Sequence, residues 1–246
     1  MEFGIGSTLA TSLRVWLRNL VPFTILSVVI HLPLAIWLGL SLRGELTADR
    51  IDDLNVSLGY GGFFAGVVLN ILLTSTLVYG VVMELRGAHA GLGASVWLGL
   101  KRFLPSLGVT LLMAVMLFLG ILSWFIPGAM VYCIFYVAVP ASVIERPGIW
   151  GALMRSSQLV NGHGFKIFGL ATLVLGGTFG LSYLTKQVLF DPDVASLDDL
   201  RIYVAVDLVR EVLTSTFAAV VVSVTYARLR ERKDGTTAEE LSRVFD

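Results

Sequence analysis

Charged side chains are missing from five long stretches of this 246-residue chain. Asp, Glu, Lys and Arg are absent from 19–42, 54–83, 103–144, 167–185 and 212–227, which are 24, 30, 42, 19 and 16 residues long. A helix rises about 1.5 Å per residue, so about 20 apolar residues cross the roughly 30 Å of hydrocarbon in a bilayer. Charged residues make up 15% of the chain, against about 25% in ordinary soluble domains. The missing charge excludes a water-soluble globular fold and indicates a polytopic membrane protein.

Cysteine, net charge and catalytic motifs are also scarce. Cys133 is the only cysteine, which excludes an internal disulfide. With 18 basic and 18 acidic residues, the chain has no positive excess to hold nucleic acid. The acidic segment 191–196 lacks the Gly and Glu of a calcium loop, and His89 and His163 have no partner at metal-ligand spacing. We therefore expect no enzymatic activity, no cofactor, no metal and no nucleic-acid partner.

The chain does contain enough apolar helix for six crossings. The stretch of 42 residues holds two of them, because Pro127-Gly128 near its middle provides a turn. We expect the spans near 20–42, 61–84, 104–125, 128–144, 166–185 and 204–227. No segment outside them is long enough for a separate soluble domain. The sequence predicts an all-α integral membrane bundle, with a single transmembrane domain over 1–246.

The basic residues are distributed unequally between the two sides of this six-span arrangement. The side that holds both termini has 13 of the 18 Lys and Arg residues, and the other side has five. Short cytoplasmic loops carry an excess of Lys and Arg in membrane proteins. The asymmetry therefore predicts that both termini, including the tail 228–246, are cytoplasmic. In that tail, Thr236 and Glu239 have the spacing of a capping box, which predicts a short helix.

Three stretches on the basic side are amphipathic and too short to cross a bilayer: 7–18, 96–104 and 149–160. Each includes a tryptophan, which is a common anchor at the membrane interface. We expect these stretches to form cytoplasmic interfacial helices at the level of the lipid headgroups.

Two short similarities suggest an internal repeat. Arg18-Asn19-Leu20-Val21-Pro22 parallels Lys101-Arg102-Phe103-Leu104-Pro105, and Leu-Thr-Ser-Thr occurs at 73–76 and 213–216. They are compatible with a threefold repeat of one interfacial helix followed by a hairpin of two spans. Glycines four residues apart, Gly62 with Gly66 and Gly176 with Gly180, allow close helix packing either within the bundle or in a homo-oligomer.

Several segments resemble a known family. Residues 140–146 read Pro-Ala-Ser-Val-Ile-Glu-Arg, 152–162 read Ala-Leu-Met-Arg-Ser-Ser-Gln-Leu-Val-Asn-Gly, and 166–170 read Lys-Ile-Phe-Gly-Leu. With Arg18-Asn19 and the segment 226–230, they are similar to the bacterial YciC-like six-span inner-membrane proteins and to the membrane domain found with glycerophosphodiester phosphodiesterases. The resemblance covers almost the whole chain and implies the inner (cytoplasmic) membrane. It transfers no catalytic residue, because the phosphodiesterase activity belongs to a separate soluble domain.

Polar residues inside or beside the spans are the first candidates for function, because charge in hydrocarbon is costly. They are His31, Asn70, Thr74, Asp207, Arg210 and Glu211. Hydrogen bonds between helices are our favoured interpretation of His31, Asn70 and Thr74, ahead of a polar path with a titrating histidine. Asp207 and Arg210 are three residues apart and can pair on one helix face near the outer interface.

Basic residues at the span ends are candidates for binding anionic lipid headgroups, at about 1 kcal/mol each near an anionic surface. They are Arg18, Lys101, Arg102, Arg155 and Lys166. An alternative for Arg155 is an ion pair with Glu145.

The sequence favours a non-enzymatic membrane scaffold or accessory subunit that binds lipid. The partners would be membrane lipids, a membrane protein or a second copy of the chain. The alternative is a small transporter or channel with a polar path through spans one, two and six, and a membrane enzyme ranks third. A polar tunnel reaching His31 or Asn70 would favour transport, whereas a solid apolar interior would favour a scaffold.

Overall fold

The computed structural model describes residues 4–41, 61–87, 91–123, 125–189 and 197–235. Within these ranges every regular element is a helix. Six helical segments are long and apolar enough to cross a membrane. The predicted all-α class and the six spans are confirmed. The acidic segment 191–196, His89 and the predicted capping box at Thr236 and Glu239 lie outside the described residues.

The spans follow one another in the predicted order. They are α2 (Leu20–Ser41), α4 (Gly62–Leu85), α5 (Leu92–Ser123), the pair α6 (Phe125–Ile134) and α7 (Ala138–Ile144), α9 (Gly164–Leu189) and α10 (Leu197–Asp234). Two shorter helices precede spans: α1 (Ile5–Arg18) leads into α2, and α8 (Gly148–Val160) leads into α9. The bounds of α1, α2, α4 and α8 agree with the expected ranges to within two residues.

Two helices are longer than expected. The amphipathic stretch 96–104 and the third span form one continuous helix, α5, with Pro105 inside it. Proline is tolerated within membrane helices because neighbouring groups satisfy the freed carbonyl. Helix α10 extends beyond the expected 204–227 at both ends, since no glycine or proline interrupts 197–234 and Gly235 follows with a φ of 68°.

The fourth span is broken where a continuous helix over 128–144 is expected. Helix α6 ends at Ile134, and α7 begins at Ala138. A break inside hydrocarbon leaves backbone groups that need internal partners. Ser156 of α8 provides two of them: its Oγ accepts the Val137 N–H at 3.3 Å and donates to the Ile134 carbonyl at 2.8 Å. One serine thus supports both sides of the break.

The spans divide into an inner and an outer set. In the most hydrophobic 18 residues of each span, half are buried in α4, α6–α7 and α10, against 22% in α2, 11% in α5 and 17% in α9. The inner spans share a core that includes Val78 and Val82 of α4, Ala141 of α7 and Val221 of α10. The second, fourth and sixth spans therefore form the centre, and the first, third and fifth spans lie outside them.

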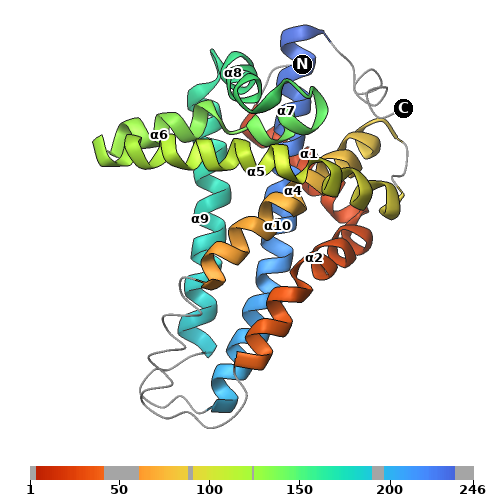
Figure 1. The fold of residues 1–246 in the computed structure, drawn as a ribbon, viewed down its shortest axis with the longest axis vertical. Helices are drawn as coiled ribbons and strands as arrows, with labels where there is room; N and C mark the ends of the chain where they lie inside the picture. Colours follow the sequence, from red (N-terminus) through yellow and green to blue (C-terminus); the bar gives the residue numbers. More distant parts are fainter. Residues whose placement is uncertain (1–3, 42–60, 88–90, 124, 190–196, 236–246) are drawn as a thin grey trace.

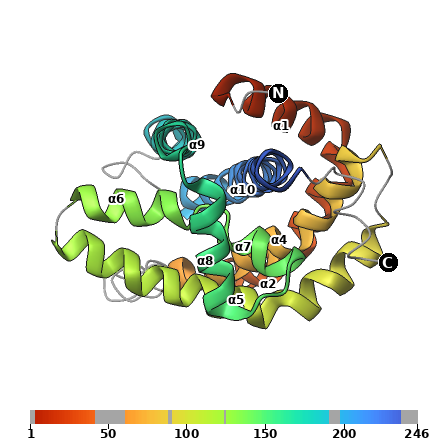
Figure 2. The same cartoon turned by 90° about the horizontal axis from the view of Figure 1, so that it is seen from above.

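The hairpin of α5 and α6 lies across the direction of α9 and α10, and the two views of the fold agree on this (Figures 1 and 2). Its two helices approach closely near the turn, where a Cβ on Gly120 would lie 3.0 Å from the Cα of Gly128. Only glycine allows that approach. The hairpin of α5 and α6 is closely packed near its turn and crosses the direction of α9, so the six spans are not parallel rods.

Helix α1 lies against α10 through its polar face. Arg228 of α10 donates to the hydroxyls of Ser7 at 2.8 Å and Thr11 at 2.6 Å. Leu13 and Leu17, on the opposite face, are exposed. An apolar face turned away from the protein is what a helix at the headgroup level needs, and the interfacial placement of α1 stays a prediction.

Candidate functional site

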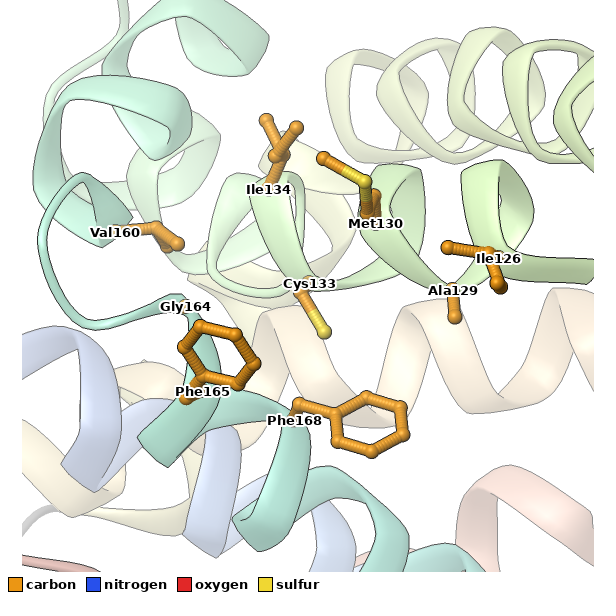
Figure 3. Close-up of a pocket in the computed structure, with 9 residues that line it drawn as sticks. All are labelled: Ile126, Ala129, Met130, Cys133, Ile134, Val160, Gly164, Phe165 and Phe168. Atoms are coloured by element: carbon orange, nitrogen blue, oxygen red, sulfur yellow. The ribbon is translucent and has the colours of Figure 1, made fainter.

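A pocket of about 400 Å³ lies between α6 and the start of α9 (Figure 3). Ligand pockets commonly have volumes of about 300–1,000 Å³. The lining residues are all apolar or glycine apart from one cysteine: Ile126, Ala129, Met130, Cys133, Ile134, Val160, Gly164, Phe165 and Phe168. We call this the lateral pocket. Its lining suits a hydrocarbon chain and gives a polar solute no partner.

Helices α6 and α9 form the two walls of the lateral pocket. Cys133 of α6 and Phe168 of α9 face the same space from opposite walls (Figure 3). Phe165 has 96% of its surface exposed, so its ring borders the open side. The walls of the pocket belong to two of the six candidate spans, since α6 is the first part of the fourth span and α9 is the fifth.

The charges of three cations act on His163, which immediately precedes pocket residue Gly164. The pKa of His163 is lowered by its burial, and by the positive charges of Arg232, Lys233 and Lys166, against an opposing hydrogen bond with the Asn161 backbone. Lys166, Arg232 and Lys233, which we call the basic rim, are exposed. They bring positive charge from two helices to one end of an apolar pocket.

The expected polar residues of spans one, two and six come together. Arg210 of α10 pairs with Asp207 at 2.8 Å and with Glu211 at 3.4 Å, and only 9% of its side chain is exposed. Asn70 of α4 donates to Glu211 Oε1 at 3.4 Å. The predicted pairing of Asp207 with Arg210 is confirmed, and an asparagine from a second helix joins the pair.

His31 is at the same level by the register of the helices. Ser27 of α2 donates to the Val212 carbonyl of α10 at 3.4 Å, so His31, one turn further along α2, is level with 208–211. The His31 ring is 3% exposed; its Nδ1 lies 2.8 Å from the Ser27 carbonyl, and its buried Nε2 has no partner in the described part of the chain. We call His31, Asn70, Asp207, Arg210 and Glu211 the polar layer.

Hydrogen bonding between helices holds for only part of the predicted set. Asn70 reaches α10, but the Thr74 hydroxyl donates to the Asn70 carbonyl of its own helix at 2.9 Å. His31 likewise bonds one turn back within α2. The interpretation as helix-to-helix bonds is therefore wrong for Thr74 and for the Nδ1 of His31, because the carbonyl four residues earlier is the nearest acceptor for such side chains.

An ion network ties α7, α8 and α10 together. Arg155 Nε lies 2.7 Å from Glu145 Oε2, and its second terminal nitrogen pairs with Asp234. Tyr226 donates to Glu145 Oε1 at 2.7 Å, and Arg230 donates to the Tyr226 hydroxyl at 3.0 Å. Burial lowers the pKa of Arg155, but its hydrogen bonds to Glu145 and Asp234 outweigh this and raise it above the ordinary value.

The five candidate headgroup residues differ in whether an acidic side chain already pairs with them. Arg155 has the predicted pair with Glu145, so its charge is already neutralised. Arg18 Nε lies 3.2 Å from Oε1 of the buried Glu84, but most of the Arg18 side chain is exposed. Lys166 belongs to the basic rim, and Lys101 and Arg102 lie on α5.

Sequence reasoning missed Asp234 as a partner of Arg155, and Tyr226 and Arg230 as partners of Glu145. Their spacing of four residues is a signal that they share one face of α10, but it does not say which helix they contact. Which helix this face of α10 contacts depends on the tertiary fold.

Comparisons with protein-family models, with curated proteins and with solved structures found no match to this chain. The resemblance to the YciC-like proteins therefore stays a prediction, and function has to be argued from the geometry.

Proposed function

We propose that this chain is a non-enzymatic multi-pass membrane protein that acts as a scaffold or accessory subunit and binds lipid. The observation that carries the scaffold role is the apolar contact between the inner spans. Leu73, Leu77 and Val81 of α4 pack with Val220 and Val224 of α10, and each is fully buried. Such packing supports a rigid platform rather than a water-filled path.

The hydroxyl groups buried between these helices support the same proposal. Ser75 donates to the Ile71 carbonyl at 2.8 Å, Ser223 to Ala219 at 2.7 Å and Thr225 to Val221 at 2.7 Å. Each bond stays within one helix. Hydroxyls that are satisfied in this way offer little to a passing polar solute.

Lipid binding is argued from the lateral pocket and the basic rim together. An acyl chain matches the apolar lining, and an anionic headgroup matches Lys166, Arg232 and Lys233 at the end of the pocket. Each cation near an anionic lipid contributes about 1 kcal/mol. The two halves of the site thus fit the two halves of one anionic lipid.

Native mass spectrometry of the full chain, released from nanodiscs of phosphatidylcholine and phosphatidylglycerol, tests lipid binding. Ala129→Phe fills the pocket, and we expect retained lipid to fall severalfold. Ala114→Phe is the matched control, because Ala114 is exposed on α5 outside the pocket. Equal retention by wild type and Ala129→Phe would refute the pocket as a lipid site.

The polar layer favours a second candidate, a small transporter or channel using spans one, two and six. It gathers a histidine, two carboxylates and a guanidinium at one level of three apolar helices, where such residues often mark ion or proton pathways. The apolar contact of α4 with α10 beyond this level counts against it.

Proton flux into liposomes that contain the purified chain separates the two candidates. A pH-sensitive dye inside the vesicles and an imposed potassium diffusion potential provide the readout and the driving force. Flux above that of empty liposomes, removed by Glu211→Gln but not by Asp234→Asn, would favour transport. Flux equal to that of empty liposomes would favour the scaffold.

A further inference from the structure

The hairpin of α5 and α6 differs from α9 in its direction. Figure 2 views α9 nearly along its axis, whereas α5 and α6 lie lengthwise across the view, and Figure 1 shows the same hairpin lying across α9. Length and composition qualify all six spans to cross a membrane. Direction is a separate property, because two helices that cross each other steeply cannot both follow the normal of one bilayer.

The contacts of α6 with α9 show the level at which the hairpin lies. The lateral pocket is lined by Ile126 and Ile134, near the two ends of α6. On the α9 side, the lining lies between Gly164 and Phe168. At about 1.5 Å per residue, α6 advances about 12 Å between its two lining residues while it passes only about 6 Å of α9. The start of α6 is therefore level with the first turns of α9 and far from Val188 at the other end of that helix.

Helix α5 gives a second reason for this placement. Its amphipathic part, 96–104, is expected at the level of the lipid headgroups, and the apolar part follows in the same continuous helix. Both parts lie across the direction of α9 (Figures 1 and 2). A helix that begins along the membrane surface and keeps that direction stays in the leaflet where it begins.

The residues around the turn of the hairpin match hydrocarbon. The segments 43–53 and 191–211, which are expected on the side opposite the termini, contain both acidic and basic residues, whereas 103–144 contains none. Exposed side chains on both sides of the turn are apolar: Leu119, Leu122, Ile126 and Met130. A turn that emerged on the far side of the bilayer would leave these side chains in water. Acyl chains are the surroundings that they match.

We propose that the hairpin of α5 and α6 lies as a wedge within one leaflet, the leaflet that contains the start of α9, and contacts the acyl chains of that leaflet alone. Helices α2, α4, α9 and α10 then make four crossings, an even number, so the predicted placement of both termini on one side is unchanged. A wedge adds area to one leaflet only, and a bilayer with unequal leaflets becomes convex on the larger side. The chain therefore favours membranes that are convex on its basic side. This role goes beyond the scaffold and lipid-binding functions proposed above.

Labelling of single cysteines with a membrane-impermeant maleimide tests the depth of the turn. In the full chain with Cys133→Ser, reconstituted in sealed vesicles, Leu122→Cys marks the turn and Val188→Cys marks the far end of α9. The two side chains are similarly exposed, at 73% and 78%. We expect Val188→Cys to be labelled from water, and Leu122→Cys only after detergent is added. Labelling of both at the same rate before detergent would show that the hairpin crosses and would overturn the proposal.

A second position and a cross-linking arm keep the labelling result interpretable. If Leu122→Cys lowers the yield of folded protein, Leu119→Cys, about one turn earlier on α5 and also exposed, replaces it. Under oxidising conditions in the same vesicles, we expect no disulfide-linked dimer of either variant. A dimer would mean that a second copy, and not lipid, covers the hairpin, and would overturn the wedge.

Membrane tubes drawn from giant vesicles test the effect on curvature. A dye attached from outside to Ser157→Cys, at an exposed position of α8, makes visible only the molecules whose basic side faces outward. A dye on Val188→Cys makes visible only the opposite orientation. The density on narrow tubes, relative to flat membrane, should rise severalfold for the first population and fall for the second. The two populations differ only in the position of the label and so control each other; equal sorting of both would overturn the wedge.

Discussion

The inner spans and the outer spans have similar apolar composition but different surroundings. Leu77 of α4 is fully buried, whereas Leu119 of α5 is 56% exposed, and both are leucines in long uncharged segments. In a soluble protein the exposed position would be polar. In a membrane the outer residues meet acyl chains that are as apolar as the core, so hydrophobicity does not separate inside from outside. Inner and outer positions differ instead in how closely they are packed and in whether their polar groups have partners.

The order of the two sets along the chain also matters. Outer and inner spans alternate, with α2, α5 and α9 each followed by an inner span. We propose that this alternation reflects the threefold repeat, each unit being an amphipathic segment, an outer span and an inner span. The three inner spans would then be equivalent members of the central contact.

The largest expected difference between inner and outer spans is in the free energy of unfolding that is lost when a large side chain is truncated. Leu77→Ala should lower the free energy of unfolding in mixed micelles by about 2–5 kcal/mol, because its neighbours on α4 and α10 cannot fill the space. Leu119→Ala, on the outer face, should change it by less than about 0.5 kcal/mol. Similar costs for the two variants would remove the distinction between inner and outer spans.

The next largest effect concerns a tyrosine in each set. Tyr226→Phe in α10 removes the donor to Glu145, and we expect a loss of about 1.5–3 kcal/mol, as for hydrogen bonds to charged groups. Tyr183→Phe, at an exposed position of α9, should be close to neutral. Thermal unfolding in detergent, followed by tryptophan fluorescence, measures both. A neutral Tyr226→Phe would show that the ion network adds no stability.

Glycine substitution tests the contact between an outer and an inner span. A Cβ on Gly99 of α5 would lie 2.9 Å from the Thr76 Cα of α4, so Gly99→Ala should cost about 1–3 kcal/mol by forcing the helices apart. A Cβ on Gly176 of α9 meets nothing within 4 Å, so Gly176→Ala should be neutral or slightly stabilising. If Gly176→Ala is the more damaging variant, α9 packs against a second copy, which cross-linking would detect.

The smallest effect is expected at the break in the fourth span. Ser156→Ala removes the acceptor of the Val137 N–H and should cost about 1 kcal/mol. Ser157→Ala, at the neighbouring exposed position, is the control and should not change the midpoint of unfolding. Hydrogen exchange at Val137 should rise only in Ser156→Ala; unchanged exchange would mean that the serine does not support the break.

Part of the candidate site was predictable from the sequence. His31, Asn70, Asp207, Arg210 and Glu211 stand out because polar residues are rare in apolar helices, and the structure brings spans one, two and six together around them. The partner of Arg155 was also predictable in part, since Glu145 is ten residues away. The lateral pocket was not, because it depends on the angle between α6 and α9, which are distant in sequence.

The sequence by itself determined that the chain belongs in a membrane, which segments are helices and roughly where those helices end. Each charged side chain or unpaired backbone group that enters hydrocarbon carries its own free-energy cost. Uncharged stretches therefore identify the spans without knowledge of the fold. Only the tertiary structure decided which spans lie at the centre, which cations are neutralised and where the hairpin of α5 and α6 diverges. These depend on packing and on ion pairs between residues up to 85 positions apart, Glu145 and Arg230. Lipid is as apolar as the core, so no local pattern encodes them.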